Sequence, residues 1–173
     1  PLQLFPQGKP GLEALEPGAK EQIVGLQAQL WHETIHGGEE MEYYLLPKLI
    51  AFAERCWAPV PDWEKDTKAH AERKKDEWSA FLNTLYGKEL PALHHLNGGY
   101  QYRIPPAGAR VEDGMLQANT ISNTLTIRYT TNGTEPDEQS AVYTIPVKAD
   151  AENIRLKVFD RAGHTSRTTS LNP

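Results

Sequence analysis

The stretch QIVGLQAQLWHE, residues 22–33, decides how the first half of the chain is interpreted. Its side chains alternate: one parity is apolar (Val24, Leu26, Ala28, Leu30), and the other carries Gln27, Gln29, Trp31 and Glu33. A period of two is typical of a β-strand, in which successive side chains point to opposite faces. We therefore predict a strand over residues 22–33 that packs its apolar face under helices. Trp31 and Glu33 would then point together into the interior at its C-terminal end.

Residues 32–36, HETIH, also fit the H-E-x-x-H pattern of zinc proteases, in which two histidines one helical turn apart hold the metal. The strand alternation runs directly into this motif, and Gly37-Gly38 follows where a zincin helix would continue. The metzincin position for a third ligand reads Glu39-Glu40-Met41-Glu42. We therefore expect surface histidines here, and metal analysis of the purified chain checks the zinc protease alternative.

Two helices are predicted after the glycine pair, over about residues 39–57 and 62–86. In the first, apolar residues recur at helical spacing (Met41, Leu45, Leu49, Phe52, Cys56). Pro47 interrupts this pattern, so we expect a kink or a helix restart there. Asp62 is suited to cap the start of the second helix, and Gly87 is suited to cap its end.

The character of the sequence changes after a linker, rich in Gly and Pro, that runs to residue 109. Short runs rich in Thr, Ile and Val follow at 115–121, 124–131, 141–148 and 154–160, with turn residues between them. Several short strands without a helical period indicate a small β-sandwich. We therefore expect two units, residues 1–104 and residues 105–173.

Composition excludes several classes of protein and of site. The 173 residues carry a formal net charge of −5, so binding to a nucleic-acid phosphate backbone is not expected. The single cysteine, Cys56, excludes an internal disulfide framework and a thiolate-rich metal site. No run of 18 apolar residues is present, so no membrane span is predicted.

Several stretches of the chain occur in the order of one known family. IVGLQAQLWHET (23–34) fits the pattern G-x-Q-x-x-L-W-x-E, and it is followed by MEYYLLPKLIAFAERCW (41–57) and GKELPALHHLNGGYQYRIPPAG (87–108). The last two stretches are IRYTTNGTEPDEQSAVYTIPV (127–147) and IRLKVFDRAGHTSR (154–167). Together they resemble the C-terminal part of the β-N-acetylhexosaminidases of glycoside hydrolase family 20, the chitobiase-like enzymes.

The resemblance implies an α+β fragment: the last strand and helices of a (β/α)₈ barrel, followed by a small immunoglobulin-like β-sandwich. It implies that Trp31 lines the pocket for a terminal N-acetylhexosamine and that Glu33 bonds the outer hydroxyls of that sugar. An aromatic ring beside a carboxylate suits a pyranose, because the ring covers the apolar C–H face and the carboxylate accepts hydrogen bonds. Gly25 and Gln27 match motif positions that we interpret as structural, through close packing and interior hydrogen bonding.

The family's chemistry is substrate-assisted, with the sugar's own acetamido oxygen attacking the anomeric carbon. The catalytic Asp-Glu pair of the family lies upstream of the last strand, so we expect no catalytic residue in this chain and no hydrolysis by it alone. No cofactor is expected. The parent enzyme would act on glycans that contain N-acetylhexosamine, and a bacterial parent would be secreted or located in the cell envelope.

The apolar surface of the barrel piece requires a cover. We expect residues 1 to about 60 to bury it by self-association, by docking on the sandwich or by packing against neighbouring molecules. The alternative to an enzyme fragment is a stand-alone, non-catalytic module that binds carbohydrate or packs against another domain.

Four further features of the sequence also lead to predictions. Tyr100 and Tyr102 are expected to attach the linker to a neighbouring domain, and His94-His95 to lie on the linker surface. Asn132-Gly133-Thr134 is a glycosylation sequon, but an Asn-Gly hairpin turn is the favoured interpretation. The acidic residues of the second half lack the spacing of a calcium loop.

Overall fold

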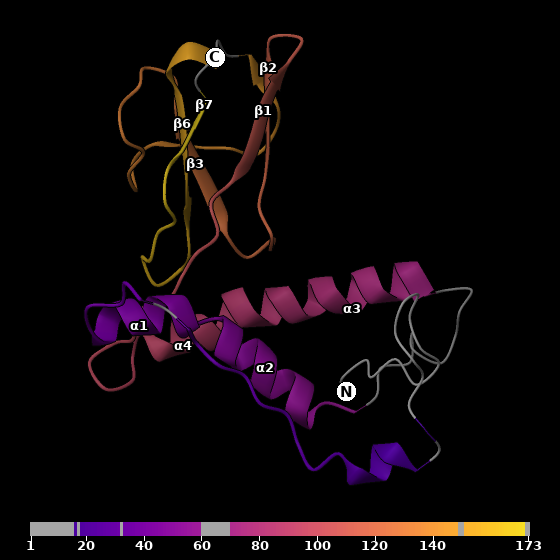
Figure 1. Cartoon of the computed structure of the whole chain (residues 1–173). Coiled ribbons are helices and arrows are strands. Elements are labelled where there is room, and N and C mark those ends of the chain that lie inside the picture. Colours follow the sequence, from indigo (N-terminus) through magenta and orange to yellow (C-terminus); the bar gives the residue numbers. More distant parts are fainter. Residues whose placement is uncertain (1–15, 17, 32, 60–69, 149–150, 172–173) are drawn as a thin grey trace.

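A computed structural model describes residues 16, 18–31, 33–59, 70–148 and 151–171. Figure 1 shows the helices gathered at one end of a β domain, with the short helix at Ala19–Gln22 on the side of the helices away from that domain. The mixed helix-and-sheet organisation expected from the sequence is confirmed. No helix in the described part of the chain is long and apolar enough to cross a membrane.

The helical part consists of several short elements and one longer helix. In chain order they are η1 (Ala19–Gln22), α1 (Gly38–Leu45), α2 (Lys48–Trp57), α3 (His70–Thr84), the π-helical turn η3 (Leu85–Glu89) and α4 (Leu90–Leu93). The break between α1 and α2 falls at Leu46-Pro47, so the restart predicted at Pro47 is confirmed. The N-cap expected at Asp62 lies outside the described residues.

The strand predicted over residues 22–33 is not formed in the described part of that segment. Gln22 ends the short helix η1, and residues 23–31 follow as unpaired chain. An extended segment becomes a stable strand only when a neighbour takes up its backbone N–H and C=O groups. Alternation alone does not supply that neighbour, and none of the described strands pairs with this segment.

Gly87 does not end the second helix, contrary to the sequence prediction. The helical path of α3 continues through η3 and α4 to Leu93, and Gly87 lies inside the π-helical turn. The glycine is required by a close approach instead, because a Cβ built on Gly87 would lie 2.8 Å from Cγ2 of Thr124 in the β domain. The absent side chain lets the helix approach the β domain.

The β domain contains two antiparallel sheets. The first, in the order β1-β2-β5, is made of Gly108–Glu112, Met115–Asn119 and Val147–Lys148. The second, in the order β4-β3-β6-β7, is made of Ala141–Val142, Thr126–Thr130, Ile154–Phe159 and Thr169–Leu171. The strands predicted near 115–121, 124–131 and 154–160 are present, the run at 141–148 is two short strands in different sheets, and β1 and β7 were not predicted.

A single apolar core joins the helices to both sheets. It takes Leu82, Leu85 and Leu90 from the helical part, and Leu116, Ile127, Leu156 and Val158 from the strands. Tyr102, Ile104 and Ala107 of the predicted linker are also buried in it. Leu46 is the only buried residue before position 82 in the described part of the chain, so residues 16–59 contribute little to this core.

Candidate functional site

The two predicted sugar-binding residues lie on the unpaired segment before α1. The Trp31 side chain is 86% exposed, and Glu33 is exposed as well. Neither has a described hydrogen bond or ring contact. The pair is therefore accessible to solvent in the described part of the chain.

Gly25 and Gln27 occupy the same exposed segment. A Cβ added at Gly25 would have no heavy atom within 4 Å, so the close packing expected there is not present in this chain. Gln27 is exposed and has no described hydrogen bond, so its expected interior bond is not present either. Both roles require neighbouring strands.

The second half of the HETIH motif leads into the start of α1 and forms a hydrogen bond with it. The backbone N–H of His36 donates to Oε2 of Glu40 at 3.0 Å, and Glu39 and Glu40 lie in the first turn of the helix, where negative charge is favourable. Residues 33–36 are not helical, whereas a zincin requires one helical turn there. His32 lies outside the described residues, and the described residues contain no group of three or more potential metal ligands.

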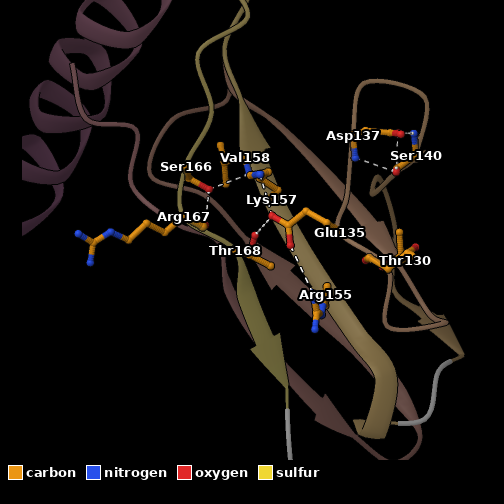
Figure 2. Close-up of polar contacts among 11 residues, drawn as sticks. Thr130, Glu135, Asp137, Ser140, Arg155, Lys157, Val158, Ser166, Arg167 and Thr168 are labelled. Atoms are coloured by element: carbon orange, nitrogen blue, oxygen red, sulfur yellow. Dashed lines mark hydrogen bonds and ion pairs between the residues drawn. The ribbon is translucent and has the colours of Figure 1, made fainter. Parts of the chain in front are cut away.

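Neither Asp-Glu dipeptide of the chain forms an acid–base centre in the structure. Asp76 and Glu77 are exposed on α3. The carboxylate of Asp137 accepts hydrogen bonds from Ser140 Oγ and from the backbone N–H groups of Gln139 and Ser140 (Figure 2). These bonds, the Ser140 hydroxyl first, lower the pKa of Asp137, which is the behaviour of a turn-forming carboxylate.

A polar cluster at the joint between helices and sheets was only partly predicted. The phenol of Tyr102 donates to Oδ2 of Asp160 at 2.5 Å, and the Tyr102 side chain is 2% exposed. Oδ1 of Asp160 accepts from the backbone N–H groups of Ala162 and His164, each at 2.9 Å. The expected attachment of the linker through Tyr102 is thus confirmed, while Asp160 left no local signal in the sequence.

The same joint holds two histidines. Nδ1 of His94, just beyond α4, lies 3.1 Å from Nε2 of His164, and the ring of His164 lies against the ring of Tyr102 with 4.1 Å between centroids. Both His94 and His95 are exposed, as predicted, but His94 has a partner that the sequence did not reveal. The partner comes from 70 residues further along the chain, so spacing could not reveal it.

A second polar cluster lies on the outer side of the four-stranded sheet. Figure 2 shows Glu135 reaching over β6, where its carboxylate contacts Lys157 Nζ at 2.7 Å, Arg155 Nη1 at 3.5 Å and the Thr168 hydroxyl. Asn132 begins the same loop and accepts from the N–H and the hydroxyl of Thr134. The segment between β3 and β4 is thus a long loop tied to the sheet, and the predicted tight Asn-Gly hairpin is not formed.

A cavity of about 620 Å³ lies between α2 and α3. Its walls include Trp57, Phe81 and three carboxylates, those of Glu54, Glu77 and Glu89. It contains neither Trp31 nor Glu33, so it is separate from the predicted sugar-binding pair.

Comparison with protein families gives two matches in tandem. Residues 5–60 match the catalytic domain of glycosyl hydrolase family 20. Residues 89–168 match the chitobiase/beta-hexosaminidase C-terminal domain, which in this structure covers α4, the buried linker and most of the β domain.

Three curated relatives bear related names. The chain is 36% identical to N,N'-diacetylchitobiase of Vibrio harveyi over 120 residues, which are 63% of the chain and 13% of that relative. It is 30% identical to Beta-hexosaminidase of Vibrio vulnificus over 130 residues, 64% of the chain and 15% of the relative. For Beta-hexosaminidase of Porphyromonas gingivalis the identity is 28% over 153 residues, 83% of the chain and 18% of the relative. The chain thus spans less than a fifth of the length of these relatives.

Proposed function

We propose that this chain, which joins a piece of a glycosyl hydrolase family 20 catalytic domain to a chitobiase/beta-hexosaminidase C-terminal domain, is the C-terminal part of an exo-acting β-N-acetylhexosaminidase. The parent enzyme releases terminal N-acetylglucosamine or N-acetylgalactosamine by a substrate-assisted, retaining reaction. The observation that carries the proposal is the tandem order of the two matched domains. The names of the relatives support it.

In the parent, residues 22–33 are the last strand of a (β/α)₈ barrel, and residues 105–173 are an immunoglobulin-like sandwich that follows a first unit ending near residue 104. The alternating apolar face of 22–33 supports the first assignment, because such a face is buried only when neighbouring strands and helices cover it. The two antiparallel sheets of the β domain support the second.

Trp31 and Glu33 bind the terminal sugar in this proposal. Two residues apart on an extended chain, they project to one side at the C-terminal end of the strand, which is the substrate face of such barrels. Their exposure in this chain is consistent with a pocket whose other walls come from the rest of the barrel. Gly25 and Gln27 support this strand through close packing and an interior hydrogen bond.

The chain alone is inactive in this proposal. The family's Asp-Glu pair orients the acetamido group and protonates the leaving oxygen, and the two Asp-Glu dipeptides of this chain are engaged elsewhere or lie exposed on α3. A hydrolysis assay of the purified chain on a chromogenic N-acetylglucosaminide should give the rate of the buffer blank. Turnover that rises with protein concentration would contradict the assignment.

The sugar-binding roles are tested in the open reading frame that contains this segment. Glu33→Gln removes a charged hydrogen-bond acceptor and should lower kcat/KM about 10- to 100-fold, while Trp31→Ala should mainly raise KM. The matched controls are Glu39→Gln and Trp57→Ala, an exposed carboxylate and an exposed indole outside the proposed pocket. Equal losses in variants and controls would refute the roles of Trp31 and Glu33.

A stand-alone packing or carbohydrate-binding module is the second candidate. It is favoured by the location of the core, because the buried residues in the described part of the chain lie almost wholly after position 81. The exposed side chains of Val24, Trp31 and Trp57 also provide apolar surface through which the barrel piece would self-associate. Binding of chitin oligomers by the isolated chain, together with an active reading frame that lacks it, would favour this second candidate.

A further inference from the structure

The joint between α4 and the β domain contains a pair of imidazoles whose contact depends on protonation. Nδ1 of His94 and Nε2 of His164 are 3.1 Å apart, and the two rings are nearly perpendicular, at 86°. A neutral imidazole has one nitrogen that donates and one that accepts, whereas both nitrogens of an imidazolium donate. The contact is thus a hydrogen bond when one of the two facing nitrogens carries a proton and the other lacks one.

We propose that His94 and His164 form a pH-sensitive latch between the end of α4 and the turn at residues 160–164, closed with one shared proton and opened when both imidazoles are charged. In the open state two N–H groups and two positive charges face each other at 3.1 Å, so the hydrogen bond is lost and repulsion replaces it. The latch belongs to the joint between helices and sheets and is independent of the proposed glycosidase role.

The turn that carries His164 is held by several hydrogen bonds. Asp160 is buried, and its carboxylate accepts from the N–H groups of Ala162 and His164, while its own N–H donates to the His164 carbonyl at 3.0 Å. The ring of Tyr102 covers one face of the His164 ring. The backbone of the turn and one face of the His164 ring are thus held in place beside His94.

The charged and titratable groups around His164 come from four elements. Its own turn supplies Asp160 and Arg161, and the linker supplies Tyr102. The end of α4 supplies His94, whose ring contacts that of His95, and the loop before β4 supplies Glu138, whose Oε1 lies 3.9 Å from the position of a Cβ on Gly163.

These surroundings favour the neutral form of His164. Burial lowers the pKa of His164 below its ordinary value, Asp160 opposes the shift, and His94 lowers it further. A histidine whose pKa is depressed by folding stabilises the folded state above its unfolded pKa of about 6.5, and this stabilisation is lost as the pH falls through the folded value. The latch is thus closed above the lowered pKa of His164 and opens only when the pH falls below it.

The test is an NMR titration of the six histidines in the complete 173-residue chain and in three variants. His164 should titrate below its ordinary value in the unmodified chain, and its pKa should rise in His94→Gln because the neighbouring positive charge is removed. In His164→Gln the loss of thermal stability between pH 7 and pH 5 should be smaller than in the unmodified chain. His36→Gln, which changes an exposed histidine before α1 that contacts neither His94 nor His164, should change neither result.

Two results would overturn the latch. One is titration of His164 at or above its ordinary value in the unmodified chain, which is also what an unfolded joint would give. The other is a His164 pKa that is the same with and without the His94 imidazole.

Discussion

Gly87 in the π-helical turn and Thr124 in the β domain approach so closely that a Cβ on the glycine would lie 2.8 Å from the Thr124 methyl group. Next to this contact, Oδ1 of Asn83 accepts from Ser122 Oγ at 2.9 Å and from the Asn123 N–H at 3.2 Å. The amide of Asn83 binds the loop at residues 122–124, and the absence of a side chain at Gly87 leaves room for it. Together they allow this surface of the helix to pack against the β domain.

Gly87→Ala should destabilise the chain. Overpacking costs about 1–3 kcal/mol, against a gain of at most about 1 kcal/mol from replacing glycine in a helix. Chemical denaturation should therefore show a net loss, partly recovered in the double variant with Thr124→Ala. Gly38→Ala is the control, because Gly38 begins α1 and has no atom within 4 Å of an added Cβ. Equal stability of the Gly87 and Gly38 variants would contradict the close approach.

Tyr102→Phe should cost about 1–3 kcal/mol of unfolding free energy, because it leaves one oxygen of the buried Asp160 carboxylate without a donor. Tyr100→Phe, which removes a hydroxyl that accepts from the exposed Asn97 side chain at 2.7 Å, should cost no more than about 0.5 kcal/mol. Urea denaturation of both variants measures the difference. Similar losses of unfolding free energy would mean that the hydrogen bond to Asp160 stabilises the fold no more than the exposed bond to Asn97 does.

The same tyrosine predicts a loss of stability in alkali. Burial and then the Asp160 hydrogen bond raise the pKa of Tyr102 above the ordinary value of 10.0, so the folded state keeps a proton that the unfolded state releases. Stability should therefore fall as the pH rises above about 10. The fall should be shallower in Tyr102→Phe. It should not disappear, because burial also raises the pKa of Tyr86, to about 12. An unchanged slope in the variant would be evidence against the Tyr102 shift.

Glu135→Gln should cost less than about 1 kcal/mol, because the ion pairs with Lys157 and Arg155 are half-exposed. Hydrogen bonds from Lys157 and Thr168 lower the pKa of Glu135. Its contribution is therefore present above the ordinary carboxyl pKa and is lost as the pH falls through the lowered value. Thermal unfolding at pH 7 in low and high salt should show a difference between the variant and the unmodified chain that shrinks with salt. Glu138→Gln, for which the structure describes no ion pair, should show no such salt dependence.

Residues 70–173 should fold without the segment before them. Among the described residues, Leu46 alone is buried before position 82, so the described side chains that removal of residues 1–69 takes from the core are Leu46 and the partly buried Ile50. Circular dichroism should show a cooperative thermal transition for 70–173 and none for residues 1–59 alone. Loss of the transition in 70–173 would mean that contacts such as Glu42 Oε2 with the Gln101 N–H are essential for folding.

Local signals in the sequence predicted the local features of the fold. Pro47 marked the helix restart, and Thr-, Ile- and Val-rich runs marked most of the strands. The strand predicted over 22–33 is not formed in the described part of that segment. Its formation depends on partner strands and not on the pattern of its own sequence. The short strand β7 and the strand β1, which begins inside the predicted linker, are likewise defined by their partners β6 and β2.

The candidate site was predictable only as far as its residue types. Trp31 and Glu33 were identified from parity and from a family pattern, and their pocket remains a proposal. The pairs Tyr102–Asp160 and His94–His164 are separated by 58 and 70 residues, and no spacing rule connects residues so distant. Such contacts follow from the topology, which places the turn after β6 beside the linker.

The burial of Tyr102, Ile104 and Ala107 has a mechanical consequence. A flexible hinge is a stretch that can change its dihedral angles without exposing apolar side chains, and residues 102–107 cannot do so. Rotation of the helices relative to the sheets would first have to extract these three side chains from the interior. The two parts should therefore separate only on unfolding, when the chain is heated or pulled from its ends.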